Sequence, residues 1–184
     1  YQFMISADSF FQTNTVQAEK LYKIVLEESK LTGKEIVYDL FCGTGSISLY
    51  LSKHANMIYG FELVMSAVQD AMQNAAHNKV KNVWFFAGNL ENLFRENSEA
   101  KDLDLPDVVI VDPPRAGLHQ KTIADVLEKS PKRIVYVSCN PATQARDVAL
   151  LCSEDYKLKR LRPVDMFPHT PHVENVATLI RKKS

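Results

Sequence analysis

The sequence predicts an α/β protein with a mostly parallel sheet and helices on both faces. Short apolar runs rich in β-branched and aromatic residues recur along the chain, and helical patterns separate most of them. This alternation is typical of a parallel sheet that is covered on both sides. The last two runs have no helical stretch between them that is long enough for a crossover, so we expect them to form an antiparallel pair.

The first half of the chain is predicted to contain a weak strand at residues 1–5, a helix, and then three strands. Asn14 suits the N-cap of a helix from Thr15 to about Leu31, and Gly33 suits its end. The apolar side of this helix is formed by Val16, Leu21, Ile24, Val25 and Leu31. The three strands are predicted at residues 36–41, 57–61 and 83–86. Helices ending near Lys53 and spanning residues 66–78 lie between them, and a short helical piece follows at residues 89–95.

The second half is predicted to begin with a charged loop at residues 96–106. A fourth strand (107–111), a helix (121–129) and a fifth strand (134–138) follow, and then a helix from Pro141 to about Cys152. Residues 157–162 are predicted to form an outer strand and residues 176–180 the last one. Their order implies a single domain with no internal repeat.

Composition limits the possible functions. The chain has 184 residues, 46% of them hydrophobic, and its 22 Lys and Arg balance 22 Asp and Glu. No apolar run is long enough to span a bilayer, so we expect no membrane association. Nucleic-acid binders usually carry a basic surplus, so RNA binding here would need a local patch or another domain.

The three cysteines are odd in number and far apart, which favours a reducing, cytoplasmic location over a disulfide framework. His169 and His172 have no cysteine nearby, and no cluster has the spacing of a metal site, so we expect no metal. The other two cysteines, Cys42 and Cys152, carry no motif of their own.

Cys139 lies where the fifth predicted strand stops and a helix begins. Asn140 suits the N-cap of that helix and Pro141 its first position. Ligands bind open parallel sheets at the carboxyl ends of the strands, and a helix N-terminus favours a thiolate. Cys139 is therefore a candidate nucleophile, although most free cysteines are simply small buried residues.

A glycine-rich turn, Gly43-Thr44-Gly45, follows the first strand, and Glu62 ends the second. Glycines let the backbone approach a ligand closely, and a carboxylate at the end of the second strand can accept hydrogen bonds from ribose hydroxyls. The turn lacks the third glycine of the dinucleotide fingerprint and has no phosphate-binding Lys, so S-adenosylmethionine is favoured over NAD or ATP. The alternative is a plain turn and a surface acid.

Two further stretches stand out. Asp112-Pro113-Pro114-Arg115 would form a rigid shelf at the end of the fourth strand, or simply terminate that strand. A similar signature in amine methyltransferases has an aromatic residue where Arg115 stands. Residues 163–174 join the last two strands with three prolines and two histidines, which is long for a hairpin and favours a functional loop. By itself, Glu174 there would be a solvated loop acid.

Together these motifs resemble the RNA uracil-5-methyltransferases, which make 5-methyluridine in transfer and ribosomal RNA. The resemblance rests on five ordered segments: residues 10–14, 39–45, 112–117, 138–147 and 164–174. It implies a Rossmann-like class I methyltransferase fold that binds S-adenosylmethionine and acts on RNA. It also implies that residues 1–184 are a catalytic domain cut from a longer protein with N-terminal RNA-binding domains, and some members also carry an iron–sulfur cluster. We expect the chain to be a monomer.

The resemblance assigns roles residue by residue. Cys139 would be the nucleophile and Glu174 the base. Around the cofactor it places Gln12, Phe41, Ser46, Glu62, Asn89 and Asp112. Ser46 stands where the family pattern has Asn, and either side chain can hydrogen-bond the polar end of the cofactor.

Two rival functions remain at this stage. An RNA cytosine-5-methyltransferase also forms a cysteine adduct, but such enzymes carry a second cysteine after the fourth strand, where this chain has Arg115. A non-catalytic module that binds RNA or a partner could dispense with Cys139 and Glu174, and both are present.

Overall fold

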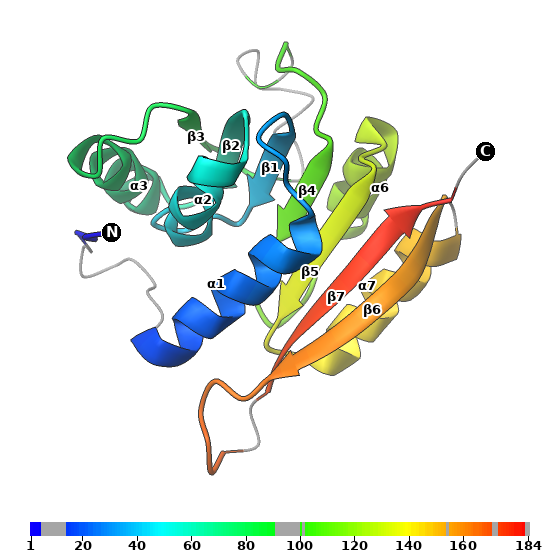
Figure 1. Ribbon diagram of the computed structural model, residues 1–184. Helices are drawn as coiled ribbons and strands as arrows, with labels where there is room; N and C mark the ends of the chain where they lie inside the picture. The colour runs from blue at the N-terminus through cyan, green and yellow to red at the C-terminus, as the bar shows by residue number, and fades with distance from the viewer. Residues whose placement is uncertain (5–13, 91–99, 101, 154, 171–172, 183–184) are drawn as a thin grey trace.

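The computed structural model describes residues 1–4, 14–90, 100, 102–153, 155–170 and 173–182. Within these residues a seven-stranded sheet has the order β3-β2-β1-β4-β5-β7-β6 (Figure 1). The strands from β3 to β5 are parallel, and β7 is antiparallel to both β5 and β6. This arrangement confirms the predicted mostly parallel sheet with an antiparallel C-terminal pair.

The bounds of the elements follow the sequence prediction closely. The strands are β1 (Ile36–Leu40), β2 (Met57–Glu62), β3 (Val83–Ala87), β4 (Val108–Val111), β5 (Arg133–Ser138), β6 (Tyr156–Val164) and β7 (Glu174–Arg181). The helices are α1 (Thr15–Ser29), α2 (Ser46–Leu51), the short 3-10 helix η1 (Ser52–His54), α3 (Met65–His77), α6 (Gln120–Lys129) and α7 (Pro141–Ser153).

Each face of the sheet supports its own core because successive strand residues point to opposite sides. In β5, Val135 and Val137 face the core that contains α1, α2 and α3, whereas Ile134 and Tyr136 face the core that contains α6 and α7. Figure 1 shows α1 and α2 in front of the sheet and α6 and α7 behind it. The strands buried on both faces therefore read as continuous apolar runs.

Helix α1 begins as predicted but ends differently. The Asn14 side chain accepts a hydrogen bond from the Gln17 amide, which confirms the N-cap. The helix ends at Ser29, with Lys30 in the left-handed conformation at φ 54°, so Gly33 belongs to the turn that follows. Val16 was predicted to be on the apolar side but is 63% exposed, since the buried stripe runs through Leu21, Val25 and Glu28 instead.

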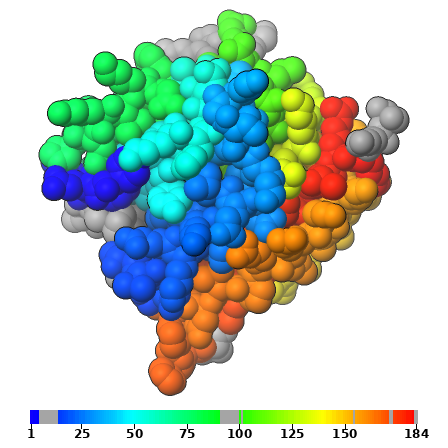
Figure 2. Space-filling view, viewed as in Figure 1, coloured from blue at the N-terminus to red at the C-terminus, as the bar shows by residue number. Residues whose placement is uncertain are grey.

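The N-terminal segment is not the predicted strand over its described part. Residues 1–4 form no regular element, and their backbone is held by the amide side chains of α3. Met4 N donates to Asn74 Oδ1 (2.6 Å), and Asn74 Nδ2 donates back to Met4 O (3.1 Å). Asn78 pairs with the backbone of Gln2 in the same way. Figure 2 shows this segment lying against the side of the molecule.

The predicted helical piece at residues 89–95 lies almost entirely outside the described residues, whereas residues 102–106 have no helix or strand, as expected for the charged loop. The predicted loop over residues 163–174 is shorter than expected. β6 continues to Val164 and β7 begins at Glu174, and these two residues are paired in the ladder. Glu174 is therefore a strand residue, 8% exposed, and not a solvated loop acid.

Candidate active site at the carboxyl edge of the sheet

The predicted site residues within the described chain lie at one edge of the sheet. The parallel strands all end there, and β7, which runs the other way, begins there because Ser138 pairs with Asn175. The residues at this edge are Phe41 after β1, Glu62 at the end of β2, Asn89 after β3, Asp112 after β4, Cys139 after β5 and Glu174 at the start of β7. Gln12 lies outside the described residues.

The Glu62 carboxylate accepts a hydrogen bond from the backbone of the glycine turn. Oε2 accepts from Gly43 N at 3.0 Å, and Oε1 accepts from the amides of Leu63 (2.7 Å) and Val64 (3.0 Å). A carboxylate has about four acceptor positions, so Oε2 keeps one position for a ligand hydroxyl. Gly43 has φ 53° and open space where a Cβ would stand, so a ligand can approach the backbone closely here.

Phe41 adopts the left-handed conformation, with φ 64°. A residue other than glycine held in this region costs on the order of 1–3 kcal/mol, and such strain clusters at functional sites. The strained position directs the chain from β1 into the turn that Glu62 contacts.

Ser46 is the first residue of α2, and its hydroxyl receives a hydrogen bond from Tyr22 Oη of α1 at 3.0 Å. A cavity of about 320 Å³ lies beside this pair, between α1, α2 and the first residues of the chain. Tyr22 is not among the residues that the sequence predicts for the site. The available signal was a tyrosine on an apolar helix face, whose hydroxyl needs a polar partner when buried.

Two carboxyl groups at this edge are shifted toward the neutral form. Asp39, fully buried in β1, accepts a hydrogen bond from Ser48 Oγ at 2.5 Å through Oδ2, and its Oδ1 has no hydrogen-bond partner among the described residues. Burial raises the pKa of Asp39 to about 7. Asp112 keeps some exposed surface but is surrounded by protein, and burial, followed by the charges of Glu174 and Asp39, raises its pKa well above the usual range.

Cys139 lies at the tip of a tight turn between β5 and α7 and is partly exposed. Ser138 Oγ accepts from Asn140 N (3.0 Å) and donates to Asn140 O (3.1 Å), so the residues on either side of the cysteine are tied together. Asn140 Oδ1 accepts from Ala142 N at 3.1 Å, which confirms the predicted cap of α7. The thiol therefore stands at a capped helix start, where the helix dipole favours negative charge.

Glu174 is buried at the start of β7. Burial raises the pKa of its carboxyl group, and the nearby positive charge of Arg115 lowers it in part. Its charge in turn raises the pKa of Asp112. Glu174, Asp112 and Arg115 therefore form one electrostatic group, contributed by β7 and by the loop after β4.

Two of the motifs noted in the sequence meet at Asn14. Its side chain caps α1 and also donates from Nδ2 to the carbonyl of Met166, at 2.9 Å. Met166 is fully buried in the β6–β7 loop, which projects beyond the sheet edge in Figure 1. The sequence suggested the cap but gave no sign of the second contact, because the two residues lie far apart in the chain.

The described residues contain no helix that is long and apolar enough to cross a membrane. Among the same residues, no three His, Cys, Asp or Glu side chains are grouped so that they could hold a metal ion.

The strand order and the placement of the glycine turn, the acid of β2 and the loop after β4 define a class I methyltransferase fold. Solved structures agree with this class. The chain matches a precorrin-6y C5,15-methyltransferase from Geobacter metallireducens at a TM-score of 0.74, with 16% identity over 97% of this chain and 94% of that one, which supports the fold alone.

A sequence model described as tRNA (uracil-5-)-methyltransferase matches residues 1–182, and the chain belongs to that family. It is 51% identical to an uncharacterized RNA methyltransferase of Bacteroides thetaiotaomicron, over 97% of this chain and 39% of the relative. The structure of Pyrococcus abyssi tRNA (uracil-54, C5)-methyltransferase in complex with S-adenosyl-L-homocysteine aligns at a TM-score of 0.81 and 39% identity, over 97% of this chain and 42% of that one. The chain thus spans about two fifths of the length of these relatives.

Proposed function

We propose that residues 1–184 form the catalytic domain of an enzyme that transfers a methyl group from S-adenosylmethionine to carbon 5 of a uridine in transfer or ribosomal RNA. The observation that carries the proposal is that Cys139 and Glu174 lie at the same sheet edge as the Glu62–Gly43 turn. Membership of the tRNA (uracil-5-)-methyltransferase family supports it.

The residues at the edge suit the cofactor. Gly43 leaves open space beside the turn, and Glu62 Oε2 keeps an acceptor position for a ribose hydroxyl. The unpartnered Oδ1 of Asp39 supplies a buried acceptor below the turn, and the carboxylates there favour a cationic ligand. We assign Phe41, Ser46, Asn89, Asp112 and, by the family pattern, Gln12 to the same binding site. When bound, S-adenosylmethionine supplies an electrophilic methyl group on its sulfonium.

Cys139 would act as the nucleophile. Carbon 5 of uracil is poorly nucleophilic, and addition of the Cys139 thiolate to carbon 6 turns carbon 5 into the nucleophilic end of an enolate. Such covalent catalysis divides one difficult step into easier ones. The base must leave its stack to reach the thiol, as in other enzymes that act on a nucleobase.

Glu174 would act as the base. After methyl transfer, carbon 5 carries both the methyl group and its original proton. Removal of that proton by the Glu174 carboxylate restores the double bond and expels the Cys139 sulfur from carbon 6. A carboxylate with a raised pKa is a stronger base than an ordinary glutamate.

The test uses the complete gene product, labelled RNA and denaturing gels. Glu174→Gln should accumulate protein covalently joined to methylated RNA, because addition and methyl transfer proceed but elimination stalls. Adding Cys139→Ala should abolish that complex, and Cys139→Ala alone should leave uridine unmethylated.

Cys152→Ala is the matched control for the thiol, since Cys152 is also partly exposed but lies at the far end of α7. It should retain activity. Methylation by Cys139→Ala would refute the nucleophile assignment, and normal turnover by Glu174→Gln would mean that another group takes the proton. Absence of 5-methyluridine with the wild-type protein would favour a non-catalytic binding module.

A further inference from the structure

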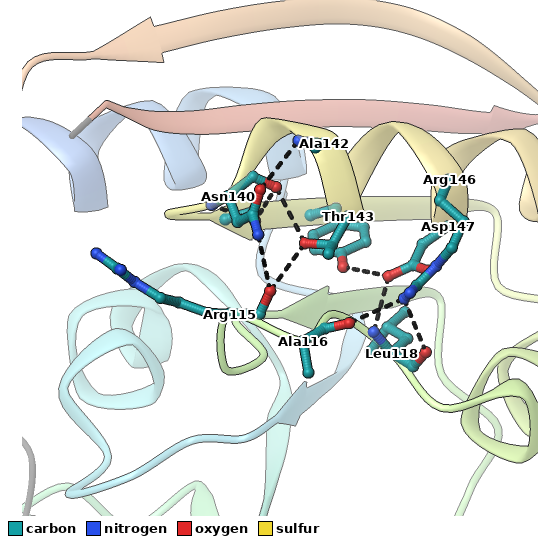
Figure 3. Close-up of polar contacts among 10 residues, drawn as sticks. Arg115, Ala116, Leu118, Asn140, Ala142, Thr143, Arg146 and Asp147 are labelled. Carbon is teal, nitrogen blue, oxygen red and sulfur yellow. Dashed lines mark hydrogen bonds and ion pairs between the residues drawn. The ribbon is translucent and has the colours of Figure 1, made fainter. Parts of the chain in front are cut away.

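The loop after β4 is hydrogen-bonded to the start of helix α7, directly beside Cys139. Asn140 Nδ2 donates to Arg115 O at 3.0 Å, and Thr143 Oγ1 donates to the same carbonyl at 3.1 Å. Figure 3 shows both bonds converging on the Arg115 backbone, while the Arg115 side chain extends away from them. The backbone of Arg115 is thus held by the residue that follows the cysteine.

A second anchor lies one turn further along α7. Asp147 is fully buried, and its Oδ2 accepts from Leu118 N and from Tyr136 Oη, both at 2.7 Å. Its Oδ1 accepts from Arg146 Nε at 2.8 Å, and Arg146 Nη2 donates to Ala116 O at 2.9 Å. Each oxygen of the Asp147 carboxylate accepts at least one hydrogen bond, and one donor is the positively charged Arg146. The negative charge of buried Asp147 is therefore compensated. Figure 3 shows that this pair connects α7, β5 and the loop.

Gly117 fits between the two anchors. Its φ is +80°, and a Cβ at this position would stand 2.5 Å from Asp147 Oδ2 and 2.7 Å from Arg146 Nη2. An alanine at residue 117 would therefore have to displace the Asp147 carboxylate and the Arg146 guanidinium from their present positions.

The loop that is held in this way carries the groups that surround Glu174. Asp112 begins the loop and Arg115 lies within it, and both interact electrostatically with Glu174 from an element other than β7. Asp112 is held to β1 by its amide, which donates to Leu40 O at 3.3 Å, whereas the backbone of Arg115, Ala116 and Leu118 is hydrogen-bonded to side chains of the α7 segment.

We propose that Arg146 and Asp147 are positioning residues that hold residues 116–118 against α7 and so fix the adjacent Arg115 relative to Cys139 and Glu174. The inference rests on the proposed methyltransferase function. It adds that helix α7 positions two groups together. The helix begins beside Cys139, and it also holds the loop whose Arg115 interacts with Glu174.

A purely structural role for the pair makes different predictions. It would lower stability and the folded fraction, and would leave the turnover of each folded molecule and its pH profile unchanged. A positioning role lowers kcat in folded protein and alters the pH profile. Cofactor affinity is preserved because the Glu62–Gly43 turn lies on other elements and Asp112 is held to β1 through Leu40 O.

The sharpest test compares Gly117→Ala with Gly33→Ala in the complete gene product. Both glycines have a left-handed backbone, at φ +80° and +90°, but nothing lies within 4 Å of a Cβ at Gly33. The two variants thus share the backbone strain, and only Gly117→Ala forces the Arg146–Asp147 pair away from the loop. Arg146→Met provides a second variant, which removes the donors and keeps an apolar stem.

We expect Gly117→Ala and Arg146→Met to lower kcat for uridine methylation at least tenfold, with the dissociation constant for S-adenosylhomocysteine within twofold of wild type. Gly33→Ala should keep wild-type kcat. The acid limb of the kcat profile should move to higher pH in both test variants, because Glu174 loses the charge of Arg115 while Asp112 remains close.

Circular dichroism and active-site titration with the bound cofactor product normalise each rate to folded protein. If kcat for each folded molecule and the pH profile both match wild type, or if Gly33→Ala falls as far as Gly117→Ala, the pair is only structural and the inference is wrong. A wild-type protein that makes no 5-methyluridine would instead refute the proposed function.

Discussion

At the scale of single residues, the carboxyl edge of the sheet carries several carboxyl groups whose pKa values are raised by burial. Asp39, Asp112 and Glu174 all shift in this direction. Each therefore binds a proton more tightly in the folded chain than in the unfolded chain, and each opposes folding once it is ionised. A cationic ligand at this edge would offset that cost, which fits a sulfonium cofactor.

Asp39 allows a direct test of this cost. Its pKa is about 7 when folded and about 3.9 when unfolded, so the folded state holds the extra proton between these values. The contribution of Asp39 to the free energy of unfolding is therefore greatest below about pH 4, falls as the pH rises toward 7, and stays constant above about pH 7. Between pH 5 and pH 8, wild type should lose about 2–3 kcal/mol more than Asp39→Asn. Urea unfolding at both pH values measures this, and equal losses would contradict the shifted pKa.

A second prediction at this scale concerns the role of Glu62 in cofactor binding. If Oε2 accepts a ribose hydroxyl, Glu62→Ala should weaken S-adenosylhomocysteine binding at least tenfold, which corresponds to about 1.4 kcal/mol. Glu35→Ala is the matched control: Glu35 also accepts from main-chain amides, those of Thr32 and Lys34, but lies at the opposite end of β1. Calorimetry should show full affinity for the control. Equal affinity in both variants would exclude Glu62 from the binding site.

The sequence was sufficient to predict where these residues lie, because each follows or ends a strand that is recognisable from its apolar run. Cys139 and Asp112 were found in this way. The burial of Glu174 could not be predicted, since it depends on how far β6 and β7 remain paired. The pairing of Arg146 with Asp147 was also missed, because neighbouring charges on a helix usually indicate a solvated face.

At the scale of elements, helix α1 is joined to the C-terminal strand pair by a buried acid. Glu28 is 5% exposed and accepts from the Thr178 hydroxyl of β7 at 2.9 Å. It also lies 3.3 Å from Arg160 and 3.4 Å from Arg162, both on β6. The helix pattern alone would place a glutamate on the exposed side. Glu28 is buried because the Thr178 hydroxyl and the arginines of β6 interact with its carboxylate.

Glu28→Ala should lower the free energy of unfolding by about 2 kcal/mol, because the buried Thr178 hydroxyl loses this acceptor. For a chain of this size that corresponds to a fall of about 4–8 °C in Tm. Glu27→Ala is the control from the same helix, since Glu27 pairs with Arg162 at the surface and exposed pairs contribute little. Thermal melts of both variants decide the question, and equal losses would show that the buried contact adds nothing.

Element bounds were predicted well where apolar periodicity and caps coincide, as at Asn14 and Asn140. They failed where tertiary contacts decide the end of an element. The last turn of α1 closes at Lys30 without glycine, and residues 1–4 are held by Asn74 and Asn78 and not by a neighbouring strand. The antiparallel pair was foreseen from the absence of a crossover helix, but its insertion of β7 between β5 and β6 depends on packing across the sheet.

At the scale of the whole molecule, the predicted site residues in the described chain come from the ends of several strands and from the segments that adjoin them, and the sheet brings them to one edge. Residues as far apart in sequence as Phe41 and Glu174 therefore lie at the same edge, where both can serve the proposed reaction.

The charge of the domain leads to the last prediction, which concerns RNA binding by residues 1–184 alone. The 22 Lys and Arg are balanced by 22 Asp and Glu. Three arginines of the described residues already pair with acids: Arg146 with Asp147, Arg160 with Glu28, and Arg162 with Glu27.

Phosphate contacts provide most nonspecific affinity, and each one contributes to the dependence on salt. We therefore expect the domain to bind single-stranded RNA no more tightly than about 10⁻⁵ M at physiological salt, with a shallow dependence on salt concentration. Fluorescence anisotropy with a labelled uridine-containing RNA at several salt concentrations measures both quantities. The complete gene product, run in parallel, should bind more tightly and with a steeper slope if other regions supply the phosphate contacts. Submicromolar binding by the domain that persists in high salt would show that its paired arginines, or the lysines of β6, contact RNA after all.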